Sequence, residues 1–411
     1  MKITVVGGGN IGTQFAVHSA EKGHDVIMYT SNPKHFSKHL SIVDKEGNVI
    51  HEGDIRKATN DAAEAFSDAD LILITMPPTM MIPLAEIIYD NTDAHTMIGF
   101  VPGNGGFEFA FKECIERGNP FFGIDRVPAI ARLTERGKTV ACSGYKEKLY
   151  IGAIPSKYTE ECAALIESIY DIECVRLPGF MALTLTPSNP ILHTSRLKTI
   201  FKDYKPGVTY KSIPLFYEEW DDESSELLLA CDDEIQAICR ALPDFGLEYV
   251  VSEREFYNSN TPEELTHAIC TEESLLGLTT PSVHVDASVE GRGFFGLISG
   301  RTHRSRKIES HMNKRLKWRY RKDVKDSKKQ IKKKTGKRTA LIPDLHSRYF
   351  TADFPYGLTV IYQIGQLAGV DMPRIDELLE WYEEIAVIND QLLLSDYGIS
   401  NMEELRAFYL Q

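Results

Sequence analysis

The sequence predicts two domains of different classes: an open α/β sheet over residues 1–175 and an all-helical domain over residues 176–411. With 411 residues, the chain exceeds the usual size of a single hydrophobic core. Strands and helices alternate up to about residue 175, which is the pattern of a mostly parallel sheet. Helical periodicity dominates beyond that point, and the expected helices cover residues 225–242, 262–276, 357–368 and 373–391.

The first element is a short β-branched strand that starts at residue 2, stops at a glycine-rich turn and leads into a helix over 10–22. Gly7, Gly9 and Gly12 satisfy G-x-G-x-x-G, in which the glycines allow a tight turn, close approach of a pyrophosphate and tight helix–strand packing. The N–H groups that open the helix, those of Asn10 and Ile11 included, would face the phosphates. Because a second strand follows over 24–29, we expect a Rossmann-type dinucleotide site rather than an ordinary tight turn.

The ribose-contacting position follows the second strand, where the chain reads TSNPK at 30–34. NAD-specific sites usually place Asp or Glu here, to accept hydrogen bonds from the ribose 2′-hydroxyl. Thr30 and Ser31 instead leave space for a 2′-phosphate, and Lys34 supplies positive charge. We therefore predict NADP as the cofactor, with NAD as the alternative.

Two further strands end in loops that bear on the same cleft. The strand over 70–74 runs into TMPP, at the carboxyl edge where open α/β sheets bind ligands, so Met76 and Pro77 join the predicted cofactor site. The strand over 96–101 runs into PGNGG at 102–106, which either lines the nicotinamide side of the cleft or is a plain β-to-α connection. The remaining expected elements are helices over 107–117 and 159–170 and strands over 138–142 and 149–153.

Composition describes an ordinary globular chain, with 43% apolar and 26% charged residues. No apolar run approaches the ~18 residues that a membrane span needs, and a strand that starts at residue 2 leaves no room for a signal peptide. The seven cysteines are scattered without a C-x-x-C pair, which is typical of reduced thiols and unlike a zinc site. We therefore expect a cytoplasmic protein with no membrane partner and no bound metal.

The net charge of −13 is unevenly distributed. Residues 301–338, the basic segment, contain 18 Lys or Arg and three acids, a net +15, so the rest of the chain carries −28. We interpret this segment first as a solvated, partly helical insertion, second as a gate or anion-steering arm over the active site, and last as a polyanion-binding arm. It contains no recognised nucleic-acid module, so nucleic acid is not expected as a partner. A homodimer is compatible with the sequence, which shows no heptad repeat.

Two polar, proline-punctuated stretches of the helical half carry the candidate chemistry. In the first, Asn189 and His193 are four residues apart, so a helix starting near Pro190 would place both near one face. Histidine suits proton transfer near neutral pH, although a helical histidine is more often a packed or surface residue. In the second, Arg348 precedes Asp353 by five residues, which suits a guanidinium site beside a buried carboxylate or, equally, a loop in which Asp353 caps the next helix.

Taken together, these stretches resemble the opine dehydrogenase family, which includes octopine and nopaline dehydrogenases. The matching motifs are GGGNIG near the N-terminus, PGNGG at 102–106, NPILH at 189–193 and RYFTADFPYGL at 348–358, in the family's order over nearly the whole chain. The resemblance implies a 6-phosphogluconate dehydrogenase-like two-domain architecture. It also implies an enzyme that joins the amine of an amino acid to a 2-keto acid, usually pyruvate, and reduces the imine with a nicotinamide hydride.

The resemblance further implies roles for individual residues. His193 matches the catalytic histidine, which accepts a proton from the incoming ammonium group, and Asp353 matches the carboxylate that orients its imidazole. Arg348 matches the arginine that grips the carboxylate of the keto acid, a task suited to its planar fork. Asn189 is expected to contact the substrate or to support the residues that do.

Two departures from the family pattern bear on the amino donor: the enlarged connection over 280–338, and Ala131, where relatives are expected to carry a cysteine that touches the amino substrate. Two other functions stay open as alternatives. One is an NADP-dependent reductase of a small keto or hydroxy acid, like the ketopantoate and glycerol-3-phosphate enzymes, which usually use a lysine as proton donor. The other is a nucleotide-sensing protein that contacts a polyanion through the basic segment.

Overall fold

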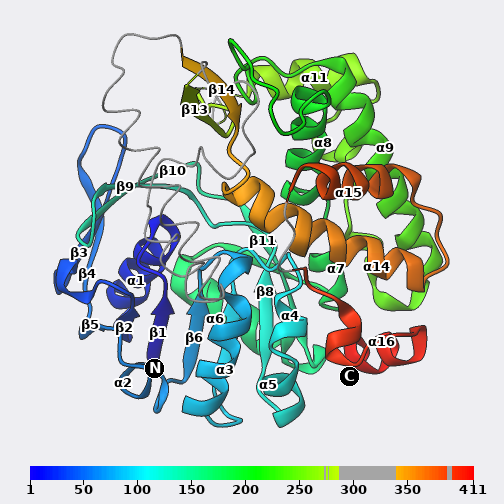
Figure 1. Ribbon diagram of the computed structural model, residues 1–411. Coiled ribbons are helices and arrows are strands. Elements are labelled where there is room, and N and C mark those ends of the chain that lie inside the picture. Colours follow the sequence, from blue (N-terminus) through cyan, green and yellow to red (C-terminus); the bar gives the residue numbers. More distant parts are fainter. Residues whose placement is uncertain (273–274, 276, 287–338, 387–390) are drawn as a thin grey trace, which may run out of the picture.

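A computed structural model describes residues 1–272, 275, 277–286, 339–386 and 391–411 of the chain (Figure 1). The basic segment 301–338 lies outside the described residues, and so does most of the enlarged connection, so the three interpretations of that segment stay predictions. Among the helices that the structure describes, none is long and apolar enough to cross a membrane.

An eight-stranded sheet forms the centre of the first half, with strand order β12-β11-β8-β7-β6-β1-β2-β5. Neighbouring strands are parallel except β8 and β11, which pair antiparallel. The strands predicted at the N-terminus, at 24–29, 70–74, 96–101 and 149–153 are confirmed. The bounds are β1 Lys2–Val6, β2 Asp25–Tyr29, β5 Lys57–Thr59, β6 Leu71–Ile74, β7 Met97–Phe100, β8 Phe121–Ile124, β11 Lys148–Ile154 and β12 Glu173–Arg176.

Helices cover both faces of this sheet, and the alternation of side chains along each strand divides the core in two. In β6, Ile72 and Ile74 face one cluster of buried residues, whereas Leu71 and Leu73 face the other. The first cluster includes residues of α2 (Ala62–Phe66), α3 (Met81–Asn91) and α5 (Lys112–Arg117), and the second includes residues of α1 (Asn10–Glu21) and α6 (Thr159–Tyr170).

The single helix expected over 107–117 is interrupted at Phe111, which divides it into α4 (Phe107–Ala110) and α5. Phe107, Phe109 and Phe111 are all buried. Residues two apart point to nearly opposite sides of a straight helix. The break lets all three rings enter the core.

A second sheet, which the sequence analysis did not predict, has four strands in the order β4-β3-β10-β9. The strand expected over 138–142 belongs to this second sheet and not to the main one, which corrects the expectation of a single sheet. Gly53 in β4 makes the close packing on α1 feasible, because an added Cβ would lie 2.7 Å from the Cβ of Ala20. The bounds are β3 His39–Val43, β4 Val49–Asp54, β9 Ile130–Glu135 and β10 Thr139–Ser143.

The second half is helical, as predicted, with one departure. Two strands, β13 (Ser282–Asp286) and β14 (Thr339–Pro343), pair antiparallel. The first ends just before residues 287–338 and the second begins just after them. Pro373 occupies the first turn of α15 as expected, but that helix ends at Ile385 rather than near 391. The bounds of the helices are α7 Met181–Thr184, α8 Asn189–Phe201, α9 Asp222–Ala241, α10 Glu253–Phe256, α11 Pro262–Thr271, α14 Thr359–Leu367, α15 Pro373–Ile385 and α16 Met402–Tyr409.

The segment Tyr349–Leu358 is a ten-residue π-helix that runs directly into α14. The helix predicted over 357–368 therefore begins at Thr359, after this wider segment. Pro355 lies inside it and has no N–H to donate, so a regular α-helical ladder could not pass through this position. Such wide turns are rare and occur most often at functional sites.

The first of the two clusters extends into the helical half and joins the two halves of the chain. The Phe121 ring of β8 lies 5.3 Å from the Phe180 ring, just before α7, and the chain end returns so that Phe408 of α16 stacks on Phe109 of α4 at 5.4 Å. The helical half lies beyond the carboxyl ends of the central strands (Figure 1). The loops that follow β1, β6 and β7 consequently face it.

Candidate active site

The glycine-rich turn between β1 and α1 has the shape that the motif predicts. Gly7 adopts a φ of +106°, and a Cβ added to Gly12 would lie 1.8 Å from the carbonyl oxygen of Gly7. Gly9 is exposed, and a Cβ added there would meet no atom of the described part of the chain within 4 Å. No side chain caps the start of α1 and its first turn contains no acid, so its N–H groups are available to an anion. These features fit a dinucleotide pyrophosphate.

Residues next to this turn connect the nucleotide half to the second half. The Thr75 hydroxyl donates to the carbonyl oxygen of Val6 at 2.9 Å, and the Met76 sulfur would lie 2.8 Å from a Cβ on Gly7. Met76 therefore borders the turn, and Pro77 follows it in the chain; their place in the cofactor site stays a prediction. Pro77 leads into the 3₁₀ turn Pro78–Met80, which packs against the π-helical segment.

The other two predicted positions of the turn differ in what their side chains do. The Asn10 side-chain oxygen accepts a hydrogen bond from the Leu133 N–H of β9 at 2.9 Å. The Asn10 side-chain oxygen thus fastens α1 to the second sheet. Ile11 is half-buried and packs against the core between α1 and the sheets.

The predicted ribose-contacting stretch, Thr30–Lys34, contains no Asp or Glu. Thr30 is nearly buried and its N–H donates to the Thr59 carbonyl oxygen at 2.9 Å, whereas Ser31 is exposed and its hydroxyl oxygen accepts from the Asn32 amide at 3.3 Å. Lys34 is exposed and has no ion pair within the described part of the chain. Its ammonium is therefore free to meet a phosphate.

His193 on α8 lies at the centre of a polar cluster in the helical half. Its Nδ1 lies 2.7 Å from Asp353 Oδ2, and its Nε2 lies 2.9 Å from the hydroxyl oxygen of Tyr217. The residue is only 2% exposed. The Asp353 carboxylate contacts the imidazole, while α14 begins without any side-chain cap, so the alternative of Asp353 as a helix cap is wrong.

Close packing of two segments far apart in sequence creates this pair. The start of α8 lies against the π-helical segment, and a Cβ added to Gly357 would lie 2.5 Å from Pro190 Cγ. The bare backbone at Gly357 is what allows α8 to approach. The Ser188 hydroxyl fixes the start of α8 by accepting the N–H of Asn189 at 2.6 Å.

The other two predicted residues lie at the ends of the same two segments. Arg348 directly precedes the π-helix and is exposed, with no ion pair among the described residues. Its Cζ lies 5.3 Å from the ring centroid of Tyr349, and that ring lies 4.2 Å from the His193 ring. Asn189 is half-buried one helical turn before His193, and its side-chain amide has no hydrogen-bond partner in the described part of the chain. The four predicted residues are thus brought to one region.

Tyr217 is a member of the cluster that the sequence analysis missed. Burial raises the pKa of its hydroxyl far above the ordinary value, so it stays protonated at neutral pH. When His193 donates its Nδ1–H to Asp353, Nε2 carries a lone pair that accepts the Tyr217 O–H. No motif marks Tyr217, because it comes from the irregular segment between α8 and α9.

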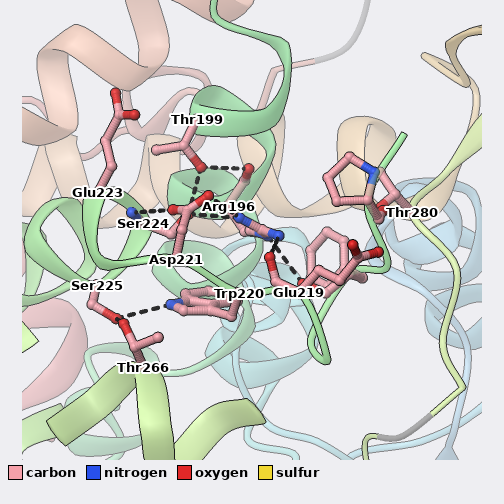
Figure 2. A network of polar contacts seen from close by, with 12 residues as sticks. Arg196, Thr199, Glu219, Trp220, Asp221, Glu223, Ser224, Ser225, Thr266 and Thr280 are labelled. Atoms are coloured by element: carbon pink, nitrogen blue, oxygen red, sulfur yellow. Dashed lines mark hydrogen bonds and ion pairs between the residues drawn. The ribbon is translucent and has the colours of Figure 1, made fainter. Parts of the chain in front are cut away.

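Arg196, one turn after His193, holds that irregular segment in place (Figure 2). Its guanidinium is fully buried and donates to the Phe216 carbonyl oxygen at 3.0 Å, to the Glu219 carbonyl oxygen and to Asp221 Oδ2 at 2.7 Å. Burial lowers its pKa, but the group keeps its charge because it is paired. By fixing the backbone on both sides of Tyr217, Arg196 acts as a positioning residue for the cluster.

The second glycine-rich turn, 102–106, meets the helical half at the same place. The Asn104 amide donates to the Ser188 hydroxyl at 3.3 Å, and a Cβ added to Gly106 would lie 2.8 Å from Val360 of α14. This turn is therefore more than a plain connection, because it contacts the start of the helix that carries His193. The two halves of the chain thus meet at one junction. It is formed by the loops that follow β1, β6 and β7 and by the segments that carry His193 and Asp353.

Family comparisons agree with this architecture. Residues 176–386 match the family described as NAD/NADP octopine/nopaline dehydrogenase, alpha-helical domain. Residues 2–102 match the family described as NADP oxidoreductase coenzyme F420-dependent. The first match covers about half of the chain and includes His193, Tyr217, Arg348 and Asp353.

Individual relatives extend over most of the chain. Octopine dehydrogenase of Mizuhopecten yessoensis is 22% identical over 93% of this chain and 90% of its own length. The uncharacterized protein y4xO of Sinorhizobium fredii is 30% identical over 59% of this chain and 68% of its own length. A solved octopine dehydrogenase structure with NADH and pyruvate superposes with a TM-score of 0.74 at 20% identity, covering 98% of this chain and 97% of the other. The last likeness concerns the fold.

Proposed function

Because the chain belongs to the octopine/nopaline dehydrogenase family, we propose that it joins an amino acid to a small 2-keto acid and reduces the resulting imine. It is an NAD(P)-dependent oxidoreductase of the opine dehydrogenase type. The observation that carries the proposal is the His193–Asp353 contact beside the exposed Arg348, at the junction with the nucleotide half. Residues 1–175 would hold the nucleotide and residues 176–411 the two substrates.

Arg348 would bind the carboxylate of the keto acid. Its guanidinium is exposed and has no carboxylate partner among the described residues, so no existing ion pair has to break. A planar fork binds a carboxylate through two parallel hydrogen bonds, which also orients the adjacent carbonyl. Asn189, whose amide is likewise unengaged, would contact the same substrate or the incoming amine. Pyruvate carries a single carboxylate, which one arginine can fix.

His193 would act as the base that deprotonates the amino donor. An ammonium group cannot attack a carbonyl carbon until it loses a proton, and Asp353 stabilises the imidazolium that forms when His193 takes it. Tyr217 occupies Nε2 in the free protein, so the amine either displaces the hydroxyl or passes its proton through it. Because the Tyr217 hydroxyl stays protonated, such a relay requires it to donate to His193 while accepting from the amine.

The nicotinamide would supply the hydride that reduces the imine carbon. The turn after β1 would hold the pyrophosphate on the N-terminus of α1, where Gly9 leaves room for it. We propose NADP rather than NAD, since Lys34 at the ribose position has no ion-pair partner among the described residues, and Thr30 and Ser31 bear no charge. Met76 and Pro77 would border the nicotinamide end of the cofactor.

An oxidation screen tests the proposal. NADPH and NADH are each followed by absorbance with pyruvate, 2-oxoglutarate or glyoxylate, with and without each of the twenty amino acids. We expect oxidation that requires both a keto acid and an amino acid, with NADPH preferred. Turnover with a keto acid alone would contradict the proposal and identify a simple keto-acid reductase. Salt-sensitive binding to heparin without turnover would instead favour a polyanion-binding protein.

A further inference from the structure

The interface between α1 and the second sheet contains a cluster of metal-binding side chains that the proposed reaction does not use. His18 and Glu21 lie one turn apart on α1, and His51 comes from β4. One ligand atom from each lies within 4.8 Å of the other two. We propose that these three residues form a site for a divalent transition-metal ion of the zinc type, independent of catalysis.

The distances suit an ion with two nitrogen ligands and one oxygen ligand. Glu21 Oε2 lies 2.8 Å from His51 Nδ1 and 3.9 Å from His18 Nδ1. Zinc bonds of about 2.0–2.1 Å in tetrahedral geometry place neighbouring ligand atoms roughly 3.3 Å apart. These two distances lie on either side of that value, and the His18 and His51 ligand atoms lie within 4.8 Å of each other, so side-chain rotations would have to bring all three atoms around the ion.

The hydrogen bonds around His18 prepare one of its nitrogens for a metal. Its Nε2 lies 3.1 Å from the Tyr145 hydroxyl oxygen, and that hydroxyl also contacts the thiol of Cys142. When Tyr145 donates to Cys142 it accepts Nε2–H from His18, which leaves the lone pair on Nδ1, the atom nearer Glu21. A metal-binding histidine characteristically donates its other ring N–H in this way.

The cluster is buried at His18 and open to solvent at His51 and Glu21. His18 is 3% exposed, and its ring packs on those of Tyr170 and His51, both at 4.5 Å between centroids. The His51 and Glu21 side chains are each about one-third exposed, which leaves an entry path and room for water as a fourth ligand.

The surrounding charges tolerate a cation. Lys22, the residue after Glu21, is paired with Asp171 at 2.5 Å, so its charge is offset. The cysteine spacing predicted no bound metal. The cluster has no sequence signature, because its two histidines are separated by 33 positions and only the fold brings them together. The ion would fasten β4 to the second half of α1, well away from the glycine turn.

Titration of the metal-stripped, tag-free full-length protein with zinc chloride, followed by calorimetry, tests the site. We expect one ion per chain with an affinity in the micromolar range or tighter, and a rise in the unfolding temperature on zinc addition. His51→Gln and Glu21→Gln should each weaken binding by at least about 10-fold and abolish the thermal shift. Both residues are partly exposed, so these variants are expected to fold.

His39→Gln is the matched control. His39 lies on the neighbouring strand β3, is exposed and also contacts carboxylates, those of Glu52 and Asp54, but it is outside the cluster. Its replacement should leave zinc affinity and the thermal shift unchanged. Failure to bind zinc at millimolar concentration would overturn the proposal, as would undiminished binding by His51→Gln or an equal loss in His39→Gln.

Discussion

The two halves of the molecule prepare their functional groups in opposite ways. The nucleotide half uses backbone: Gly7, Gly9 and Gly12 and the first N–H groups of α1 form the proposed anion site, to which no side chain contributes. The helical half uses side chains that the fold must collect, since His193 and Asp353 are 160 residues apart. A site of the first kind depends on local geometry, whereas a site of the second kind depends on packing between distant segments.

This difference teaches where each half is vulnerable. Backbone N–H groups do not titrate, and the glycine turn tolerates change only where space is open. The helical cluster contains titratable groups that are buried and paired, and it rests on the close packing of Pro190 against Gly357 and on the buried Arg196. Substitutions and pH should therefore affect the two halves differently.

The largest expected effect is on the side-chain site. His193→Ala should lower turnover by at least ~10²-fold, the scale of general acid–base catalysis, and leave NADPH affinity unchanged because the nucleotide site is made elsewhere. Steady-state kinetics and a fluorescence titration with NADPH measure the two quantities. His267→Ala, an exposed position on α11 in the same half, is the control. Unchanged turnover would remove His193 from the proposed mechanism.

pH should act on the helical half through a buried acid. Burial raises the pKa of Glu253 to about 8, above the unfolded value of 4.5, with Asp232 nearby adding to the effect. Between these values the unfolded chain has released the proton that the folded chain keeps, so the stability of the protein falls as pH rises. Glu253→Gln cannot ionise and should be more stable than the parent at pH 8 by on the order of 2–4 kcal/mol, with little difference near pH 4. Urea unfolding of both proteins at the two pH values measures this, and identical pH dependence would contradict it.

Alanine substitutions at two glycines of the turn should affect different properties: nucleotide affinity at Gly9 and protein stability at Gly12. Gly9→Ala adds a methyl group to open space, so folding should be unaffected, while nucleotide affinity falls about 10-fold because the methyl group occupies the proposed pyrophosphate position. Gly12→Ala would place a Cβ 1.8 Å from the Gly7 carbonyl oxygen and should destabilise the protein itself. Thermal unfolding and NADPH titration separate the two cases. Normal NADPH affinity in Gly9→Ala would mean that the cofactor lies elsewhere.

A smaller effect is expected from the residue that the motifs did not mark. Tyr217→Phe removes one hydrogen bond to His193 Nε2 and keeps the ring, so turnover should fall by about 3- to 10-fold. If Tyr217 relays the proton, the pH profile of turnover should shift as well, which a purely structural change would not produce. The reverse finding, full activity with an unshifted profile, would show that the amine reaches His193 directly.

The smallest expected effect is on cofactor choice. Lys34→Ala should weaken NADPH binding by about 2- to 5-fold and leave NADH binding unchanged, since an exposed ion pair contributes little. Lys38→Ala, also exposed and close in sequence, controls for a general change of surface charge. Equal losses for the two nucleotides would show that Lys34 does not contact the 2′-phosphate.

The sequence was most informative where structure is local. The strand, the glycine turn and the helix after it depend on neighbouring residues, and the same holds for the start of α8 at NPILH. The second sheet could not be foreseen, because β3 pairs with β10 almost 100 residues later and each strand is short. For the same reason, the sequence did not predict Tyr217 or the cluster of His18, Glu21 and His51, because tertiary packing determines which residues these side chains contact. Asp353 was recognised only through the resemblance, because its spacing fitted a helix cap equally well.

A crystal structure of the complete chain with NADPH and pyruvate tests the central claim most directly. The account predicts the pyrophosphate on the N-terminus of α1, the pyruvate carboxylate on Arg348, and the His193 imidazole on the substrate side of the nicotinamide. A nicotinamide bound away from the junction, with His193 and Arg348 out of reach of the pyruvate, would contradict it.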